Sequence, residues 1–202
     1  MHKTLFKLLP LALASALTGC VSLTPPPATT HFETQSTTTR AQKLKAIRRW
    51  NIQGAMSVRQ KSKAHIANFS WQLQSKHHYQ IRLSSTLNVY NLLIKSTGQH
   101  LTLNQNKKQP ITATSPRELM QKAVGFSLPI SNLYYWVRGL AAPGKNQATF
   151  NQYGLLSRLQ QQGWRIQYLR FKKINKVDLP QLIQLTRNDL SIRLVLKKWG
   201  IK

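Results

Sequence analysis

The chain has 202 residues, of which 41% are hydrophobic. This length suits one domain with a single core, and the hydrophobic content excludes wholesale disorder. Lys and Arg number 30 against four acidic residues, which gives a formal net charge of +26. Such a charge attracts anionic partners, so nucleic acid, an anionic membrane surface and acidic proteins all stay open. A generally basic proteome is the remaining explanation.

The N-terminal segment has the pattern of a secretory signal. Met1–Leu9 carries Lys3 and Lys7, and an apolar run follows from Leu8 to Leu17. This run is too short to span a bilayer but has the length of a signal-peptide core. It ends in Leu17-Thr-Gly-Cys20, which resembles the signal of bacterial lipoproteins, where the cysteine thiol receives a diacylglyceryl group.

We therefore expect residues 1–19 to be a signal peptide and Cys20 to carry covalent diacylglyceryl and N-acyl groups. Cys20 is the only cysteine in the chain, so no disulfide can form within a monomer. In the general lipoprotein sorting scheme an Asp after the cysteine favours the inner membrane, whereas here Val21 follows. We expect a lipid-anchored outer-membrane protein that faces the periplasm. Loss of Lys3 and Lys7 would leave a net charge of +24.

Residues 20–39 are rich in Thr, Ser and Pro and read as a flexible linker. The folded domain is predicted to span residues 40–202. A helix is expected at Arg40–Arg49, with Ala41, Leu44 and Ile47 on one face. Its basic face would allow binding to anionic lipid, but packing of the apolar stripe on a sheet is the favoured interpretation.

From Trp50 onward the apolar residues alternate with polar ones, which indicates antiparallel strands with one apolar face. A helix is predicted from Ser115 to about Val124, because Ser115-Pro-Arg-Glu118 matches a capping box. A shorter helix is predicted at Ser131–Arg138, ended by Gly139. The pattern predicts one mainly β (α+β) domain. The expected strands are Trp50–Arg59, Ala67–Leu73, Tyr79–Leu83, Val89–Lys95, Leu101–Asn104, Leu155–Gln160, Trp164–Leu169, Leu182–Arg187 and Leu190–Trp199.

Residues suited to catalysis are sparse. Glu118 is explained as part of a helix cap, Asp178 falls in a predicted turn before Leu179-Pro180, and Asp189 falls in a predicted hairpin. No carboxylate pair, phosphate loop or nucleophile motif is evident, so neither an enzyme nor a metal site is expected. The histidines of this region are dispersed along it: His65, His77, His78 and His100.

Nucleic acid is the second interpretation of the charge. Aromatic and basic residues interleave over Tyr168–Lys173, a pattern that suits base stacking. The same pattern describes a strand with one cationic face, and the secretory signal favours that explanation, so no nucleic-acid partner is expected. Five tryptophans on apparent strand and helix faces would either fill a core or line an apolar cavity.

Several segments, in order, resemble the LolB family of outer-membrane lipoprotein receptors. The resemblance runs from about Leu44 to Trp199, and the cysteine signal at the N-terminus adds to it. The segments are the strand Trp50–Gly54, the strand through Trp71, Leu128-Pro-Ile-Ser-Asn-Leu-Tyr-Tyr-Trp-Val-Arg-Gly139, Gly163–Tyr168, Leu179-Pro180 and Ile192–Trp199.

The resemblance implies an unclosed antiparallel β-barrel of roughly eleven strands, with helices as a lid over a hydrophobic cavity. It implies a monomeric, non-enzymatic protein that accepts lipoproteins from the periplasmic carrier LolA. The protein would then insert their acyl chains into the inner leaflet of the outer membrane. The alternative is a structural or ligand-binding envelope lipoprotein with no transfer activity.

The resemblance also implies roles for individual residues. Leu87 matches a family leucine that protrudes from a loop between two strands to insert into the membrane. Thr86 and Asn88 replace the family's proline and glycine beside it, and Ala142 stands where proline is common. The candidates for the acyl cavity are Trp50, Ile52, Met56, Phe69, Trp71, Trp136, Trp164 and Trp199.

Overall fold

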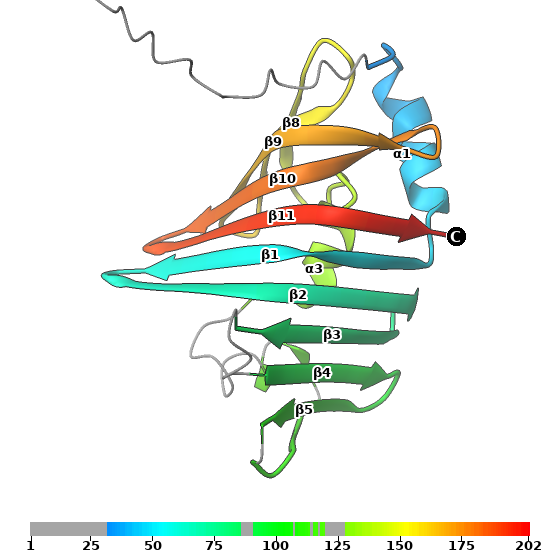
Figure 1. The fold of residues 1–202 in the computed structure, drawn as a ribbon. Coiled ribbons are helices and arrows are strands. Elements are labelled where there is room, and N and C mark those ends of the chain that lie inside the picture. The colour runs from blue at the N-terminus through cyan, green and yellow to red at the C-terminus, as the bar shows by residue number, and fades with distance from the viewer. Residues whose placement is uncertain (1–31, 86–90, 107, 114, 117, 120–127) are drawn as a thin grey trace, which may run out of the picture.

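The structure is a computed structural model that describes residues 32–85, 91–106, 108–113, 115–116, 118–119 and 128–202. These residues form an eleven-stranded antiparallel sheet in the order β6-β5-β4-β3-β2-β1-β11-β10-β9-β8-β7 (Figure 1). The end strands β6 and β7 do not pair with each other, which confirms the predicted unclosed barrel. The strands are β1 (Trp50–Gln60), β2 (Lys63–Ser75), β3 (His78–Ser84), β4 (Asn91–Thr97), β5 (Leu101–Gln105), β6 (Ile111–Ala113), β7 (Gln147–Phe150), β8 (Leu156–Gln161), β9 (Trp164–Ile174), β10 (Val177–Arg187) and β11 (Leu190–Ile201).

Alternation along the strands places the core on one face of the sheet. In β1, Trp50, Ile52, Met56 and Val58 are buried, whereas Gln53 on the other face is exposed. Successive side chains of a strand point to opposite faces, so the period of two read from the sequence sorts these residues correctly. The strand predicted at Trp50–Arg59 is confirmed as β1.

The two helices predicted at Arg40–Arg49 and Ser131–Arg138 are confirmed with shifted ends. Helix α1 spans Thr37–Ala46 rather than 40–49, because Ser36 caps it by accepting a hydrogen bond from the Thr39 amide at 3.1 Å. Leu44 and Ile47 join the core, so this helix packs on the sheet rather than exposing its apolar stripe.

Helix α3 spans Ile130–Trp136, and Gly139 follows it with a φ of +78°, which glycine adopts readily. At the other predicted helix, the Ser115 hydroxyl accepts a hydrogen bond from the Glu118 amide at 3.2 Å. Pro116, Glu118 and Leu119 are helical, and the remainder of that predicted helix lies outside the described residues. No helix in the described ranges is long and apolar enough to cross a membrane.

The predicted turn at Asp178–Pro180 is wrong, because these residues lie within β10. The turn occurs earlier, at Asn175 and Lys176, which have φ values of 47° and 67°. A register shift follows Pro180 in the pairing of β10 with β9, and such bulges tolerate a residue that has no N–H. The short strands β6 and β7 were not predicted, and every residue of β7 is exposed.

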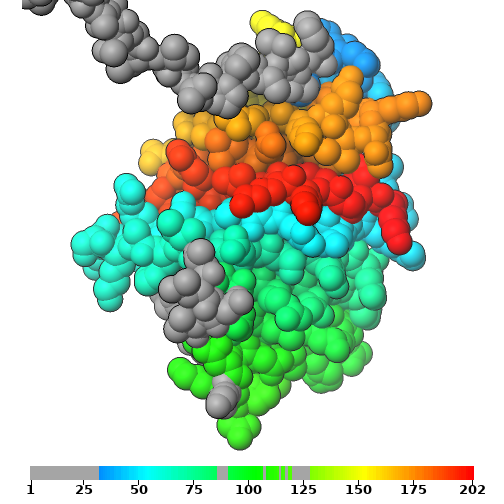
Figure 2. Space-filling model, viewed as in Figure 1, coloured from blue at the N-terminus to red at the C-terminus, as the bar shows by residue number. Residues whose placement is uncertain are grey.

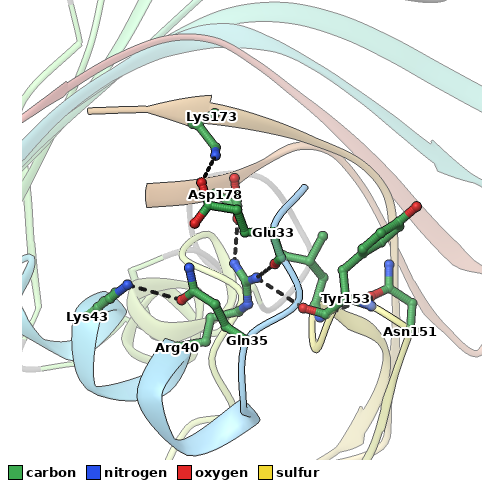
Figure 3. Close-up of polar contacts among 9 residues, drawn as sticks. Glu33, Gln35, Arg40, Lys43, Asn151, Tyr153, Lys173 and Asp178 are labelled. Atoms are coloured by element: carbon green, nitrogen blue, oxygen red, sulfur yellow. Dashed lines mark hydrogen bonds and ion pairs between the residues drawn. The ribbon is translucent and has the colours of Figure 1, made fainter. Parts of the chain in front are cut away.

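A buried ion pair joins α1 to β10 (Figure 3). Arg40 Nη1 donates to Asp178 Oδ2 at 2.6 Å, and Nη2 donates to the carbonyl oxygens of Glu33 and Tyr153 at 3.1 and 3.0 Å. The Lys173 ammonium donates to the Glu33 carboxylate at 2.9 Å and lowers the pKa of that carboxyl. The contacts of the domain therefore begin before residue 40, within the stretch read as linker.

Candidate functional site

An apolar cavity of about 450 Å³ opens on the concave face of the sheet. This volume lies within the range of small-molecule binding sites, about 300–1,000 Å³. Five neighbouring strands, from β11 through β1 and on to β4, contribute inward-facing side chains to it. The wall formed by the strands consists of Met56, Val58, Ala67, Phe69, Trp71, Ile81, Leu83, Ile94 and Leu194.

The facing wall comes from α3 and its flanks. Leu128, Ile130, Leu133 and Val137 line the cavity with hydrocarbon from this side. In Figure 1, α3 lies behind β1 and β2, across their concave side. The helix therefore acts as a cover over the sheet, as the predicted lid requires.

The cover is fixed at its C-terminal end by buried hydrogen bonds. The Trp136 indole donates to Gln161 Oε1 at 2.9 Å, and Tyr168 donates its hydroxyl proton to the Trp136 carbonyl at 3.0 Å. Gln161 also bonds both the amide and the carbonyl of Ala142, at 2.9 and 2.6 Å. Burial raises the pKa of Tyr168, which keeps the hydroxyl protonated as a donor.

Arg138 ties the same cover to α1. Its side chain is 1% exposed, and Nη1 donates to the carbonyl oxygens of Leu44 and Ile47 at 3.1 and 2.8 Å. The guanidinium also lies 4.2 Å from the centre of the Tyr134 ring and 5.1 Å from that of Trp50. Burial lowers the pKa of Arg138, while contact with Tyr134 raises it. A cation that caps the end of α1 and stacks on two rings fixes the angle between α1 and α3.

Two of the described lining residues are exposed to solvent, so the mouth of the cavity opens toward the end of the β1–β2 hairpin, where Ser85 also contributes to the lining. His65 and Ile66 lie there, and Ile66 is 68% exposed. Among the described lining residues, His65 is the one titratable side chain. Elsewhere in the lining, the Trp71 indole N–H is buried without a hydrogen-bond partner in the described structure.

The sequence model of a family described as outer membrane lipoprotein LolB matches residues 48–199. The chain belongs to the LolB family. A Coxiella burnetii protein named outer-membrane lipoprotein LolB is 40% identical over 187 residues, which cover 92% of this chain and 89% of that one. One from Cellvibrio japonicus, with the same name, is 37% identical over 204 residues and 96% of each chain. These relatives place the protein at the outer membrane.

Solved structures share the fold at low sequence identity. A LolA superfamily protein from Nitrosomonas europaea is 11% identical, with a TM-score of 0.52 over 83% of this chain and 94% of that one. A putative outer membrane lipoprotein-sorting protein domain from Vibrio parahaemolyticus is also 11% identical, with a TM-score of 0.50 over 81% and 91%. Both have an architecture like that of this LolB-family chain.

The structure brings Met56, Phe69 and Trp71 of the predicted cavity residues to the cavity wall. It places the other five outside the lining. Four of them are strand residues whose side chains face the same side of the sheet, and Trp136 lies on α3; neighbouring rings pack beside Trp50 and Trp136. The five are Trp50, Ile52, Trp136, Trp164 and Trp199.

Their contacts show where they pack. Trp50 contacts Tyr134 of α3, with 5.1 Å between ring centres, and Trp136 contacts Trp164 at 6.3 Å. Trp199 donates its indole proton to the Pro180 carbonyl at 3.2 Å. These residues lie in the closed part of the core, outside the lining of this cavity, and their contact with an acyl chain stays a prediction.

The residues of α3 and its flanks that line the cavity were not among the predicted cavity residues. Leu128, Ile130 and Leu133 had appeared only within a family segment, although their apolar spacing over a short helix was a usable signal.

A metal site is not indicated, since the described residues hold no group of three or more His, Cys, Asp or Glu suited to one. Cys20 and Leu87, proposed for lipid attachment and membrane insertion, lie outside the described residues.

Proposed function

We propose that this outer-membrane lipoprotein accepts lipoproteins from the periplasmic carrier LolA and inserts them into the inner leaflet of the outer membrane. The observation that carries the proposal is the apolar cavity of about 450 Å³, whose described lining is almost entirely hydrocarbon. Each acyl methylene transferred from water to such a site is stabilised by about 0.8 kcal/mol. An acyl chain therefore needs a host of this kind to cross the aqueous periplasm.

The direction of transfer follows from relative affinity. A chain moves from carrier to cavity to bilayer when each host holds it more tightly than the one before, and no bond needs to be made or broken. His65 at the mouth is the one titratable side chain among the described lining residues, which supports a non-enzymatic role. The alternative is a structural or ligand-binding envelope lipoprotein. Family membership supports this alternative less well than it supports lipoprotein transfer.

Release into the membrane is assigned to Leu87. Ser85, two positions before this leucine, is among the residues that line the cavity. Burial of one leucine in a bilayer contributes about 1.5–3 kcal/mol. That amount favours a brief contact during release and is too small for permanent anchoring, which the acyl groups on Cys20 would supply.

A transfer assay tests the proposal. LolA loaded with an acylated lipoprotein is mixed with the protein and liposomes, and the lipoprotein is followed by flotation. Leu87→Glu should accept the lipoprotein but fail to deliver it. Leu169→Glu is the matched control, because Leu169 is a 51% exposed leucine on β9, and it should behave as wild type.

Normal delivery by Leu87→Glu would show that the role given to Leu87 is wrong. Failure of the wild-type protein to take any lipoprotein from LolA would reject the proposed function as a whole.

A further inference from the structure

The tip of the β1–β2 hairpin combines exposed cations with an exposed isoleucine. Arg59, Lys61, Lys63 and His65 are all exposed, and Ile66 is 68% exposed. β1 and β2 have 11 and 13 residues, and the tip projects farther than the other strand ends in Figures 1 and 2. We define residues 59–66 as the hairpin tip.

The cationic charge of the tip is only partly offset by neighbours. The tip contains no acidic residue, and Glu33 and Asp178 are engaged by Lys173 and Arg40 in the α1–β10 network. Asp189 lies in the β10–β11 turn. This turn is adjacent to the hairpin tip, because Gln60 pairs with Leu190.

The same turn region also supplies positive charge. Arg187, at the end of β10, is exposed beside Asp189, and Arg193 is exposed on β11, where it pairs with Ser57 of β1. The surface around the hairpin tip therefore has an excess of positive charge.

The hairpin tip also borders the exit of the cavity. His65 and Ile66 line the mouth, opposite Val58 and Ser57 in the register of β1 with β2. An acyl chain that leaves the cavity through this mouth passes the hairpin tip. A cationic surface with an apolar side chain at its edge matches the boundary between anionic headgroups and hydrocarbon.

We propose that the hairpin tip is a docking arm that places the cavity mouth against anionic phospholipid headgroups. This inference rests on the proposed function and adds a membrane-contacting element separate from the Leu87 loop. The cations contact headgroup phosphates, and Ile66 enters the edge of the hydrocarbon. An isolated exposed isoleucine at the cavity exit suits a bilayer, which can accept an acyl chain at that point, better than it suits the acidic rim of a carrier protein.

A site-specific probe tests the contact. Cys20 is the chain's only cysteine, and the proposed lipid would occupy its thiol, so Ser62→Cys gives a single labelling position in the turn between Lys61 and Lys63. The full lipid-anchored protein, labelled with a fluorophore, is placed in vesicles of phosphatidylcholine alone or with phosphatidylglycerol, and quenching by a lipid-borne spin label is measured. Gln99→Cys, between β4 and β5 at the opposite end of the sheet, is the control.

The Ser62 probe should be quenched on anionic vesicles, less so on neutral ones, and the quenching should decline at high salt. The Gln99 probe should remain unquenched on both. A Ser62 probe that stays in water on anionic vesicles would overturn the proposal.

A matched pair of charge variants separates this arm from overall charge. Arg59→Gln, Lys61→Gln and Lys63→Gln together should weaken the contact roughly 100-fold, since each cation near an anionic surface contributes about fivefold. The control removes one arginine and two lysines from the other end of the sheet. Its changes are Arg170→Gln, Lys172→Gln and Lys176→Gln, and Lys61 and Lys176 share a positive φ.

The hairpin triple variant should also deliver lipoprotein more slowly to anionic vesicles while it accepts lipoprotein from LolA normally. Loss of acceptance with membrane contact intact would overturn the proposal and assign the surface to the carrier protein. If the wild-type tip contacts the membrane but no lipoprotein is accepted, the proposed function fails while the docking arm stands.

Discussion

Replacement of Ala67 by Phe should block the cavity without disturbing the fold. Ala67 lies in the wall formed by the strands, pairs with Met56 across β1 and β2, and is half-buried. Its methyl group leaves free space in front of it, so a phenyl ring attached there projects into the cavity rather than into packed core. The substitution therefore removes ligand volume while it adds apolar contact to the protein.

The size of the effect follows from the cavity volume. An apolar cavity of about 150 Å³ holds a benzene molecule, so a phenyl ring would take up roughly a third of the 450 Å³. An acyl chain that loses only three buried methylenes loses about 2.4 kcal/mol, which weakens binding roughly 50-fold. The free energy of unfolding should stay the same or rise slightly.

Displacement of a fluorescent fatty acid measures the affinity, and urea denaturation checks the fold. Ala55→Phe is the control, because Ala55 precedes Met56 on β1, faces the other side of the sheet and does not line the cavity. Ala55→Phe should bind the probe as wild type does. Unchanged binding by a folded Ala67→Phe protein would refute the assignment of the acyl site to this cavity.

Three further predictions concern the scaffold. Arg40→Gln should lower the free energy of unfolding by roughly 3–5 kcal/mol in urea, because it leaves the buried Asp178 carboxylate without its counter-ion, and an unchanged midpoint would contradict this. Gly54→Ala should lower the melting temperature, since its Cβ would collide with the Val195 carbonyl oxygen; an equal melting temperature would show that the strands can separate without cost. Burial raises the pKa of Tyr79 from 10.0 to about 12. The contribution of this side chain to the free energy of unfolding is therefore intact below pH 10 and is lost as the pH rises through 12. This loss amounts to roughly 2–3 kcal/mol for two pH units, and Tyr79→Phe should show a correspondingly shallower alkaline decline in urea titrations, whereas an identical slope would reject the cause.

The strands could be predicted from the sequence where burial is one-sided. In β1 the alternation of Trp50, Ile52 and Met56 with polar residues reflects a core on one face and water on the other. β7 offers no such signal, because all four of its residues are exposed at the edge of the sheet. A strand without a buried face has no alternation of apolar and polar residues from which it could be predicted.

The β10 segment shows a different limit. Asp and Pro favour turns, yet Asp178 and Pro180 lie in a strand, because Asp178 pairs with Arg40 and Pro180 lies at a register shift. Arg40 is 138 positions away in sequence, so local propensity could not reveal the pairing that outweighs it.

The family resemblance predicted a cavity, but the position of the cavity could not be predicted from the sequence. Alternation showed that Trp50, Trp71 and Trp164 face inward, and all three are buried. It could not show which part of the inner face the helices would leave open. That division depends on α3, whose position is set by Arg138 and Gln161 through contacts with distant segments.

The central claim is that acyl chains occupy the cavity between helix α3 and the five neighbouring strands β11, β1, β2, β3 and β4. The most direct measurement is photo-crosslinking of a lipoprotein with a photoreactive acyl chain, handed over from LolA, followed by mass spectrometry of the labelled peptides. We predict crosslinks to lining residues such as Met56, Trp71 and Leu133, and their loss in Ala67→Phe. Crosslinks confined to the convex face of the sheet, or unaffected by Ala67→Phe, would contradict the account.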